Sequence, residues 1–95
     1  MSVAELERGL RDLAALLRPV GESRWADWAS RSADAVAAGA DPATVRRAFG
    51  GMGSLNDLVI HPINGHHVEP GRVAEINERL AQLRESVYTA SVPEG

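Results

Sequence analysis

The chain has 95 residues and a formal net charge of −3, and its ten arginines and thirteen carboxylates are mixed along the sequence without a basic stripe, which argues against nucleic-acid binding. It contains no lysine and no cysteine, so lysine Schiff bases, phosphate-loop lysines, disulfides, thiolate catalysis and cysteine-ligated zinc are excluded. The length predicts one domain, residues 1–95, with an ordered core at about 3–90.

The first helix is predicted over residues 3 to 18. Ser2 and Glu5 have the spacing of a capping box, in which each side chain satisfies an amide at a helix start. Four leucines then recur at spacings of four, three and four and therefore share one face, namely Leu6, Leu10, Leu13 and Leu17. Pro19 and Gly21 are expected to end this helix.

A second helix is predicted from about residue 22 to 38, followed by Gly39 in the left-handed position that often ends a helix. Its inner face is expected to carry Trp25, Trp28 or Ala29, Ser32 and Val36. Asp41 and Pro42 then mark the start of a short third helix, which ends at Gly50.

The last helix is predicted from Pro70 to about Ala90. Five apolar residues repeat along it at alternating spacings of three and four, namely Val73, Ile76, Leu80, Leu83 and Val87. We therefore expect a mainly α fold, a bundle of three to four helices. Its core is expected to be thin, with much of its bulk supplied by the aromatic residues Trp25, Trp28, Phe49 and Tyr88.

Residues 58–68 do not resemble a helix. Leu58, Val59 and Ile60 form a short strand-like run, and Asn64-Gly65 is a strong signal for a two-residue hairpin turn, because both central residues of that turn need positive φ. The sequence predicts a minor β-hairpin here. In that register His61 and His66 are diagonal neighbours on one face.

The stretch Gly50-Gly51-Met52-Gly53-Ser54 is rich in glycine and precedes the polar residues Asn56 and Asp57. Its phosphate-binding interpretations fail: there is no lysine for a Walker loop, and Asn56 stands where a dinucleotide fingerprint needs its third glycine. A structural turn that needs glycine at three positions is the simpler interpretation. The alternative is a loop whose amides bind an anion or whose backbone meets a partner.

A sequence resemblance bears on this stretch. The run FGGMGSLNDLVI from Phe49 to Ile60, with Asn64-Gly65-His66 and with residues 77–80 and 87–88, resembles an uncharacterised family of small bacterial helical proteins that share a GGMGS(L/F)NDL motif. The resemblance covers roughly residues 45 to 90. Proteins similar to these are found near polymorphic toxin genes, so the resemblance implies an immunity role and no catalytic residue.

The histidines His61, His66 and His67 allow a second interpretation, a small enzyme or a metal-dependent protein. In the predicted hairpin only two of them share a face, which is fewer than the three or four ligands that zinc takes. A Ser54-based triad lacks the nucleophile-elbow motif. We therefore expect no metal, no cofactor and no catalytic residue, although an enzyme is not excluded.

The leading hypothesis is a non-enzymatic protein-binding module, in particular one that neutralises a cognate toxin. The residues expected to meet a basic partner are Met52, Ser54, Asn56, Asp57, His61, His66 and Glu69. The residues expected to shape the turns are Gly50, Gly51, Gly53, Asn64 and Gly65. A structural homodimer is a third hypothesis. No apolar run has the length of about 18 residues that a membrane span needs, and we expect a cytoplasmic protein.

Overall fold

The computed structural model describes residues 3–50 and 54–92, and this part of the chain is mainly helical, as predicted. Its α-helices are α1 (Val3–Leu17), α2 (Ser23–Ala37), α3 (Ala43–Arg46) and α4 (Val73–Ser91). Its short 3-10 helices are η1 (Arg47–Phe49), η2 (Leu55–Asp57), η3 (Pro62–Asn64) and η4 (Pro70–Arg72). The long helices therefore begin and end within a few residues of their predicted bounds.

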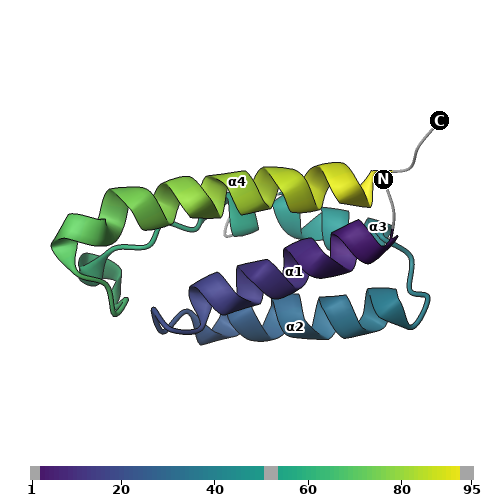
Figure 1. Ribbon diagram of the computed structural model, residues 1–95, viewed down its shortest axis with the longest axis horizontal. Helices are drawn as coiled ribbons and strands as arrows, with labels where there is room; N and C mark the ends of the chain where they lie inside the picture. Colours follow the sequence, from purple (N-terminus) through teal and green to yellow (C-terminus); the bar gives the residue numbers. More distant parts are fainter. Residues whose placement is uncertain (1–2, 51–53, 93–95) are drawn as a thin grey trace.

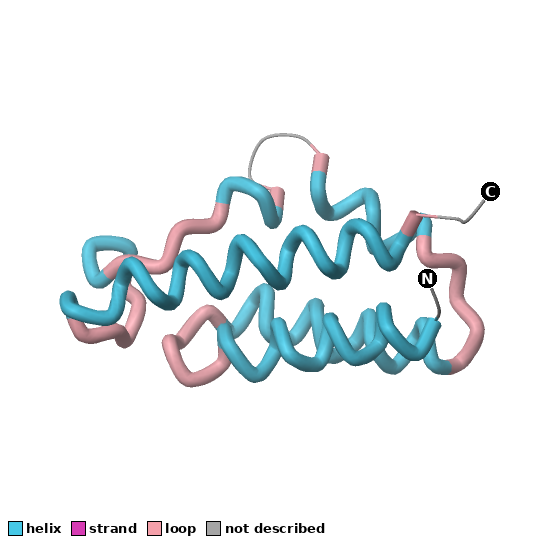
Figure 2. Tube along the Cα trace, turned by 45° about the horizontal axis from the view of Figure 1, so that its top comes forward, coloured by secondary structure: helices cyan, strands magenta, loops and turns pink. Residues whose placement is uncertain are grey.

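Two antiparallel helices, α1 and α2, form a hairpin, and α4 lies along it in the direction opposite to α1 (Figure 1). The short α3 lies at the end of the molecule where α2 finishes. The segment from residue 54 to residue 69 then returns along α4 to the far end, where it turns into the start of that helix (Figure 2). This return segment has no long helix of its own and brings all three histidines to one end of the molecule.

The core is aliphatic. The four α1 leucines predicted to share one face are fully buried, and four of the five predicted α4 residues join them in the core, namely Ile76, Leu80, Leu83 and Val87. On α2 the buried face consists of Ala26, Ala29, Ala33 and Val36. Because alanine is small, such a face allows α1 and α2 to approach closely. No helix in the described part of the chain is both long enough and apolar enough to cross a membrane.

The predicted aromatic core is wrong. Trp25 and Trp28 lie edge to face at the border of the core, with ring centroids 5.4 Å apart, and are only partly buried. Phe49 is half-buried, and Tyr88 keeps 46% of its surface exposed. The alanine stripe faces inward on α2, so the bulky tryptophans beside it are displaced toward the rim.

The predicted β-hairpin is also wrong. Residues 58–68 contain no strand: the chain is extended around residues 58–61, forms η3, and turns at Gly65. Gly65 has φ +84°, but no residue other than glycine has positive φ in the described part of the chain, so Asn64 does not adopt the type I′ conformation. Pro62 begins a 3-10 turn instead, and the extended residues find partners elsewhere, as described below.

The predicted glycine turn is not supported where it can be observed. Gly50 is extended, with φ −110° and ψ 151°, instead of left-handed, and no atom crowds the position that a Cβ would take. Ser54 to Asp57 have ordinary backbone conformations. Gly51, Met52 and Gly53 lie outside the described residues, as does Ser2 of the predicted capping box. Left-handed glycines occur at Gly21, Gly39 and Gly65, and the prediction for Gly39 is confirmed.

Gly9 lies where α1 meets α4. A Cβ at this position would stand 3.0 Å from Cγ2 of Val87, a side chain that is fully buried and so has little room to move. We expect Gly9→Ala to lower the free energy of unfolding by about 1 kcal/mol, because overpacking outweighs the gain in helix propensity, itself about 1 kcal/mol. Urea unfolding measures this change. A control substitution, Val87→Ala made together with Gly9→Ala, should cost less than the sum of the two single changes.

Candidate functional site

The return segment is attached to α4 by the side chain of Asn77. Its Oδ1 accepts a hydrogen bond of 2.8 Å from the backbone N–H of Ile60, and its Nδ2 donates to the Ile60 carbonyl at 2.7 Å and to the Val73 carbonyl at 2.9 Å. The Ile60 side chain is fully buried in the core. The sequence predicted a neighbouring strand as the hydrogen-bonding partner of this extended backbone. The side-chain amide of Asn77 takes that role instead, because it offers both a donor and an acceptor.

Residues 59–65 form a braced loop beyond this attachment. The backbone N–H groups of Ile63, Asn64 and Gly65 all donate within the loop, to His61 Nδ1 at 3.1 Å, to the His61 carbonyl at 2.9 Å and to the Pro62 carbonyl at 3.0 Å. Asn64 Nδ2 also donates to the Val59 carbonyl at 3.2 Å. The polar groups of the loop are thus used to hold its own conformation.

The other end of the braced loop is held by the turn between α1 and α2. His66 Nε2 lies 2.9 Å from Oε1 of Glu22, and their side chains are only 6% and 17% exposed. The His67 backbone N–H donates to the Val20 carbonyl at 2.8 Å, and the His67 ring lies against left-handed Gly21. The loop is therefore fixed at both ends, by α4 on one side and by the α1–α2 turn on the other.

The hydrogen bonds of His66 define its tautomer. Its Nδ1 accepts from the His61 backbone N–H at 3.1 Å, so Nδ1 carries no proton in this arrangement and Nε2–H donates to Glu22. We expect ¹⁵N-resolved NMR at pH 8 to show His66 as the neutral Nε2–H tautomer. His61, whose Nδ1 also accepts a backbone hydrogen bond, should give the same pattern, and an Nδ1–H signal from His66 would contradict this geometry.

Arg84 of α4 holds the part of the return segment nearest the glycine stretch. Its Nη1 donates to the carbonyls of Leu55, Asn56 and Leu58 at 3.2, 3.3 and 3.0 Å. Burial lowers the pKa of the Arg84 guanidinium, which nevertheless remains charged at neutral pH. Asn56 Nδ2 donates to the Phe49 carbonyl at 2.8 Å and so bridges the two sides of the undescribed residues 51–53.

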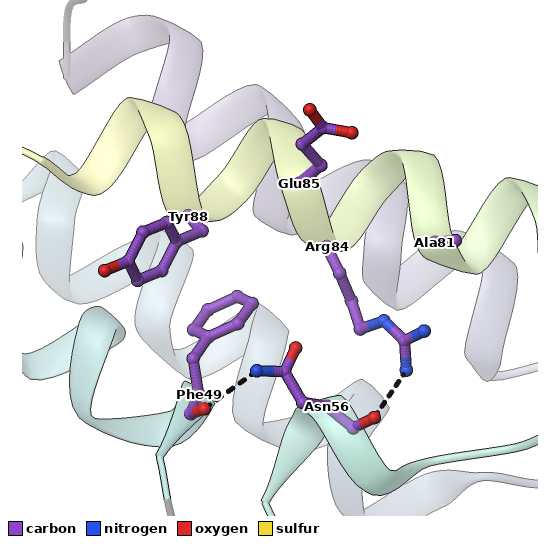
Figure 3. Close-up of a pocket in the computed structure, with 6 residues that line it drawn as sticks. All are labelled: Phe49, Asn56, Ala81, Arg84, Glu85 and Tyr88. Carbon is purple, nitrogen blue, oxygen red and sulfur yellow. Dashed lines mark hydrogen bonds between the residues drawn. The ribbon is translucent and has the colours of Figure 1, made fainter.

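An open groove of about 450 Å³ lies between α4 and these contacts (Figure 3). Its lining residues are Phe49, Asn56, Ala81, Arg84, Glu85 and Tyr88. The rings of Phe49 and Tyr88 meet edge to face with centroids 5.4 Å apart. Arg84 turns toward the return segment, whereas Glu85 points to the other side of the helix, so the groove holds no pair of facing acid and base groups.

The structure does not gather the predicted partner-binding residues on one surface. Ser54 is buried, and the His66 side chain faces Glu22 inside the molecule, whereas Asn56, Asp57, His61 and Glu69 are exposed. Met52 lies outside the described residues. In the ranges 3–50 and 54–92 there is no group of three or more His, Asp or Glu side chains placed to hold a metal ion. The three histidines instead have contacts that fix the loop.

Sequence reasoning missed Ile63 as a surface residue. It is 85% exposed, more than any other large apolar side chain in the described part of the chain, and Val59 beside it in the braced loop is 53% exposed. A signal was present, because Ile63 stands between Pro62 and Asn64-Gly65 in a sequence typical of turns, and turn residues are usually polar. The predicted hairpin had assigned this isoleucine to a strand.

Comparison with protein families gives a match over the middle of the chain. A family model described as a domain of unknown function (DUF6966) matches residues 18–69, slightly more than half of the chain. The matched segment begins at the end of α1 and includes the α1–α2 turn, α2 and the whole braced loop, so both partners of the His66–Glu22 contact lie within it. No curated protein and no solved structure matches the chain.

Proposed function

The chain belongs to the DUF6966 family, and from this premise and the geometry of its loop we propose that it is a non-enzymatic protein-binding module. The observation that carries the proposal is a loop fixed at both ends. Its polar groups form hydrogen bonds within the loop, and its apolar side chains, Ile63 and Val59, are exposed to solvent. An exposed isoleucine adds nothing to the core. A rigid loop loses little conformational entropy on binding, so one that exposes both Ile63 and Val59 is suited to contact with another protein.

Within residues 3–50 and 54–92 the histidines are engaged in contacts that hold the loop, which supports a binding role over a catalytic one. Each histidine has a contact that holds the loop: His61 accepts from Ile63, His66 lies against Glu22, and His67 packs on Gly21. The groove between α4 and the return segment is open, and general acid–base catalysis needs a base within hydrogen-bonding reach of a bound substrate.

The particular partner that we propose is a cognate toxin that this chain neutralises. Support comes from the resemblance of residues 45–90 to small proteins found beside toxin genes, and from the acidic charge of the chain, which favours a basic partner. Coexpression tests this version: where a toxin-like reading frame lies beside this gene, the chain should abolish the growth arrest that its product causes. Growth arrest that persists although both proteins are made would refute the toxin version alone.

The binding role itself is tested by site-specific photo-cross-linking in the source cells. A photoreactive residue at Val59 should give one discrete heavier product, because this side chain is exposed beside the loop tip. The matched control carries the same residue at Ala35 and should give no such product. Ala35 is exposed near the last residue of α2, and this end of α2 lies opposite the α1–α2 turn that holds the loop (Figure 1). Equal labelling from both positions, or no product from either, would refute the proposal. A product with the mass of two chains would instead indicate a homodimer.

A further inference from the structure

We propose that the partner offers an apolar pocket with basic residues at its rim and that this pocket takes the Ile63 side chain. This inference rests on the proposed binding function and specifies the chemistry of its partner. The side chain is 85% exposed, so nearly all of its surface is free to be buried on binding. Complete burial of an isoleucine side chain strengthens binding by about 10- to 100-fold, which makes Ile63 the strongest apolar anchor on this loop.

The loop holds Ile63 in a single position before the partner arrives. Its backbone N–H is bonded to His61 Nδ1, and the next two N–H groups close the 3-10 turn. Left-handed Gly65 reverses the chain immediately afterwards, and His66 and His67 fasten it to the α1–α2 turn. A loop that is ordered before binding loses little conformational entropy when the partner binds. Little of the free energy gained by burying the isoleucine is therefore offset by an ordering cost.

The hydrogen bonds within the loop tip limit the ways in which a partner can contact it. The N–H groups of Ile63, Asn64 and Gly65 are all used within the loop, so the tip can neither add a strand to a sheet nor bind an anion with successive amides. Recognition at the tip therefore depends on apolar burial, with Val59 extending the apolar surface on one side.

The charges near the loop indicate which sign of charge the rim of the partner's pocket should carry. From residue 48 to residue 71 the chain contains no arginine or lysine but has the acids Asp57 and Glu69, so this segment supplies −2 of the total charge of −3 and the remaining residues supply −1. Glu69 follows the loop and is exposed, and its charge helps to raise the pKa of the nearby Arg72 guanidinium. Arg72 is itself paired with Glu75 at 2.6 Å, so Glu69, Arg72 and Glu75 together keep a net charge of −1. Basic residues on the partner complement this charge, whereas nucleic-acid phosphates and anionic lipids would be repelled.

The test uses the partner identified by the Val59 cross-link, purified and titrated by calorimetry. Ile63→Ala should weaken binding by about 50-fold, because the three carbon atoms that it removes contribute roughly 0.8 kcal/mol each when buried, about 2.4 kcal/mol in all. Ile63→Asp should weaken it by about 100-fold or more, since it would bury an unpaired charge. Val3→Ala is the matched control, and it should leave the affinity unchanged. Val3 is 50% exposed and is the first residue of α1, whose beginning lies at the opposite end of the molecule from the α1–α2 turn (Figure 1).

The rim is tested separately with Glu69→Arg, which should weaken binding about threefold to tenfold at low salt and have less effect at 0.5 M salt, where charges are screened. All variants should have the same melting temperature as the wild type, because the replaced side chains are exposed. Unchanged affinity of Ile63→Asp for a partner that does cross-link at Val59 would overturn this inference and leave the binding function standing. Absence of any cross-linked partner would refute both the binding function and this inference. Binding of the chain to phosphatidylglycerol vesicles would refute the proposal that Ile63 enters a pocket on a protein.

Discussion

Replacement of Asn77 by alanine is expected to lower the free energy of unfolding by about 2 to 4 kcal/mol, because it leaves the N–H and C=O of Ile60 without partners at a buried position. Each unsatisfied buried group costs about 1 to 3 kcal/mol, partly relieved here by water. A chain of this length has a total stability of roughly 5 to 14 kcal/mol, so the loss is a substantial fraction of the whole.

Urea unfolding followed by circular dichroism measures this loss, and hydrogen exchange at the Ile60 amide shows where it acts. The exchange rate of that amide should rise much more than the rates of the α1 amides. Gln82→Ala is the control on the same helix: Gln82 is exposed, its contact with Arg79 is a marginal 3.5 Å, and its loss should change stability by less than about 0.5 kcal/mol. An Asn77→Ala variant as stable as this control would show that the bridge to Ile60 contributes nothing.

The second large effect is expected at Arg84. Arg84→Met retains the apolar stem but removes the donor shared by three carbonyl groups, those of Leu55, Asn56 and Leu58. We expect a loss of about 1.5 to 3 kcal/mol, the usual contribution of hydrogen bonds to a charged group. Arg84→Lys should recover part of this loss, because an ammonium also donates but lacks the fork of the guanidinium.

The control for Arg84 is the same substitution at Arg79, whose guanidinium is exposed on α4 and contacts only the Gln82 side chain at 3.5 Å among the described residues. Arg79→Met should change the midpoint of urea unfolding little. Exchange of the Leu58 amide should accelerate in Arg84→Met and stay the same in Arg79→Met. If both variants lose the same stability, the cause is the loss of positive charge from α4 and not the contact with the return segment.

The long helices could be predicted because their signals are local. Leucines at spacings of three and four lie on one face of any helix, so the buried sides of α1 and α4 follow from the order of residues alone. The inner face of α2 was less predictable. Its tryptophans are more hydrophobic than its alanines, but the close approach of two helices favours small side chains, and this preference becomes visible only when the partner helix is in place.

The braced loop shows the limit of local signals. Asn64-Gly65 and the run Leu58-Val59-Ile60 favour a hairpin when they are considered alone, but a strand needs a partner for its backbone, and here Asn77, seventeen residues along the chain, provides it. The polar residues expected to bind a partner were identified by type. Whether such a residue faces solvent or its own backbone is a property of the folded chain, which is why Ser54 and His66 are found inside and Ile63 outside.

The sequence by itself determined the helical class, the bounds of the long helices, the leucine faces and the exclusion of lysine and cysteine chemistry, because these depend on residue type and on spacing within one element. Only the tertiary structure decided the path of residues 54–69, the roles of the histidines and the exposure of Ile63. These features depend on contacts such as His66 with Glu22, 44 residues apart, and no short-range pattern specifies which distant group will satisfy a backbone or a ring nitrogen.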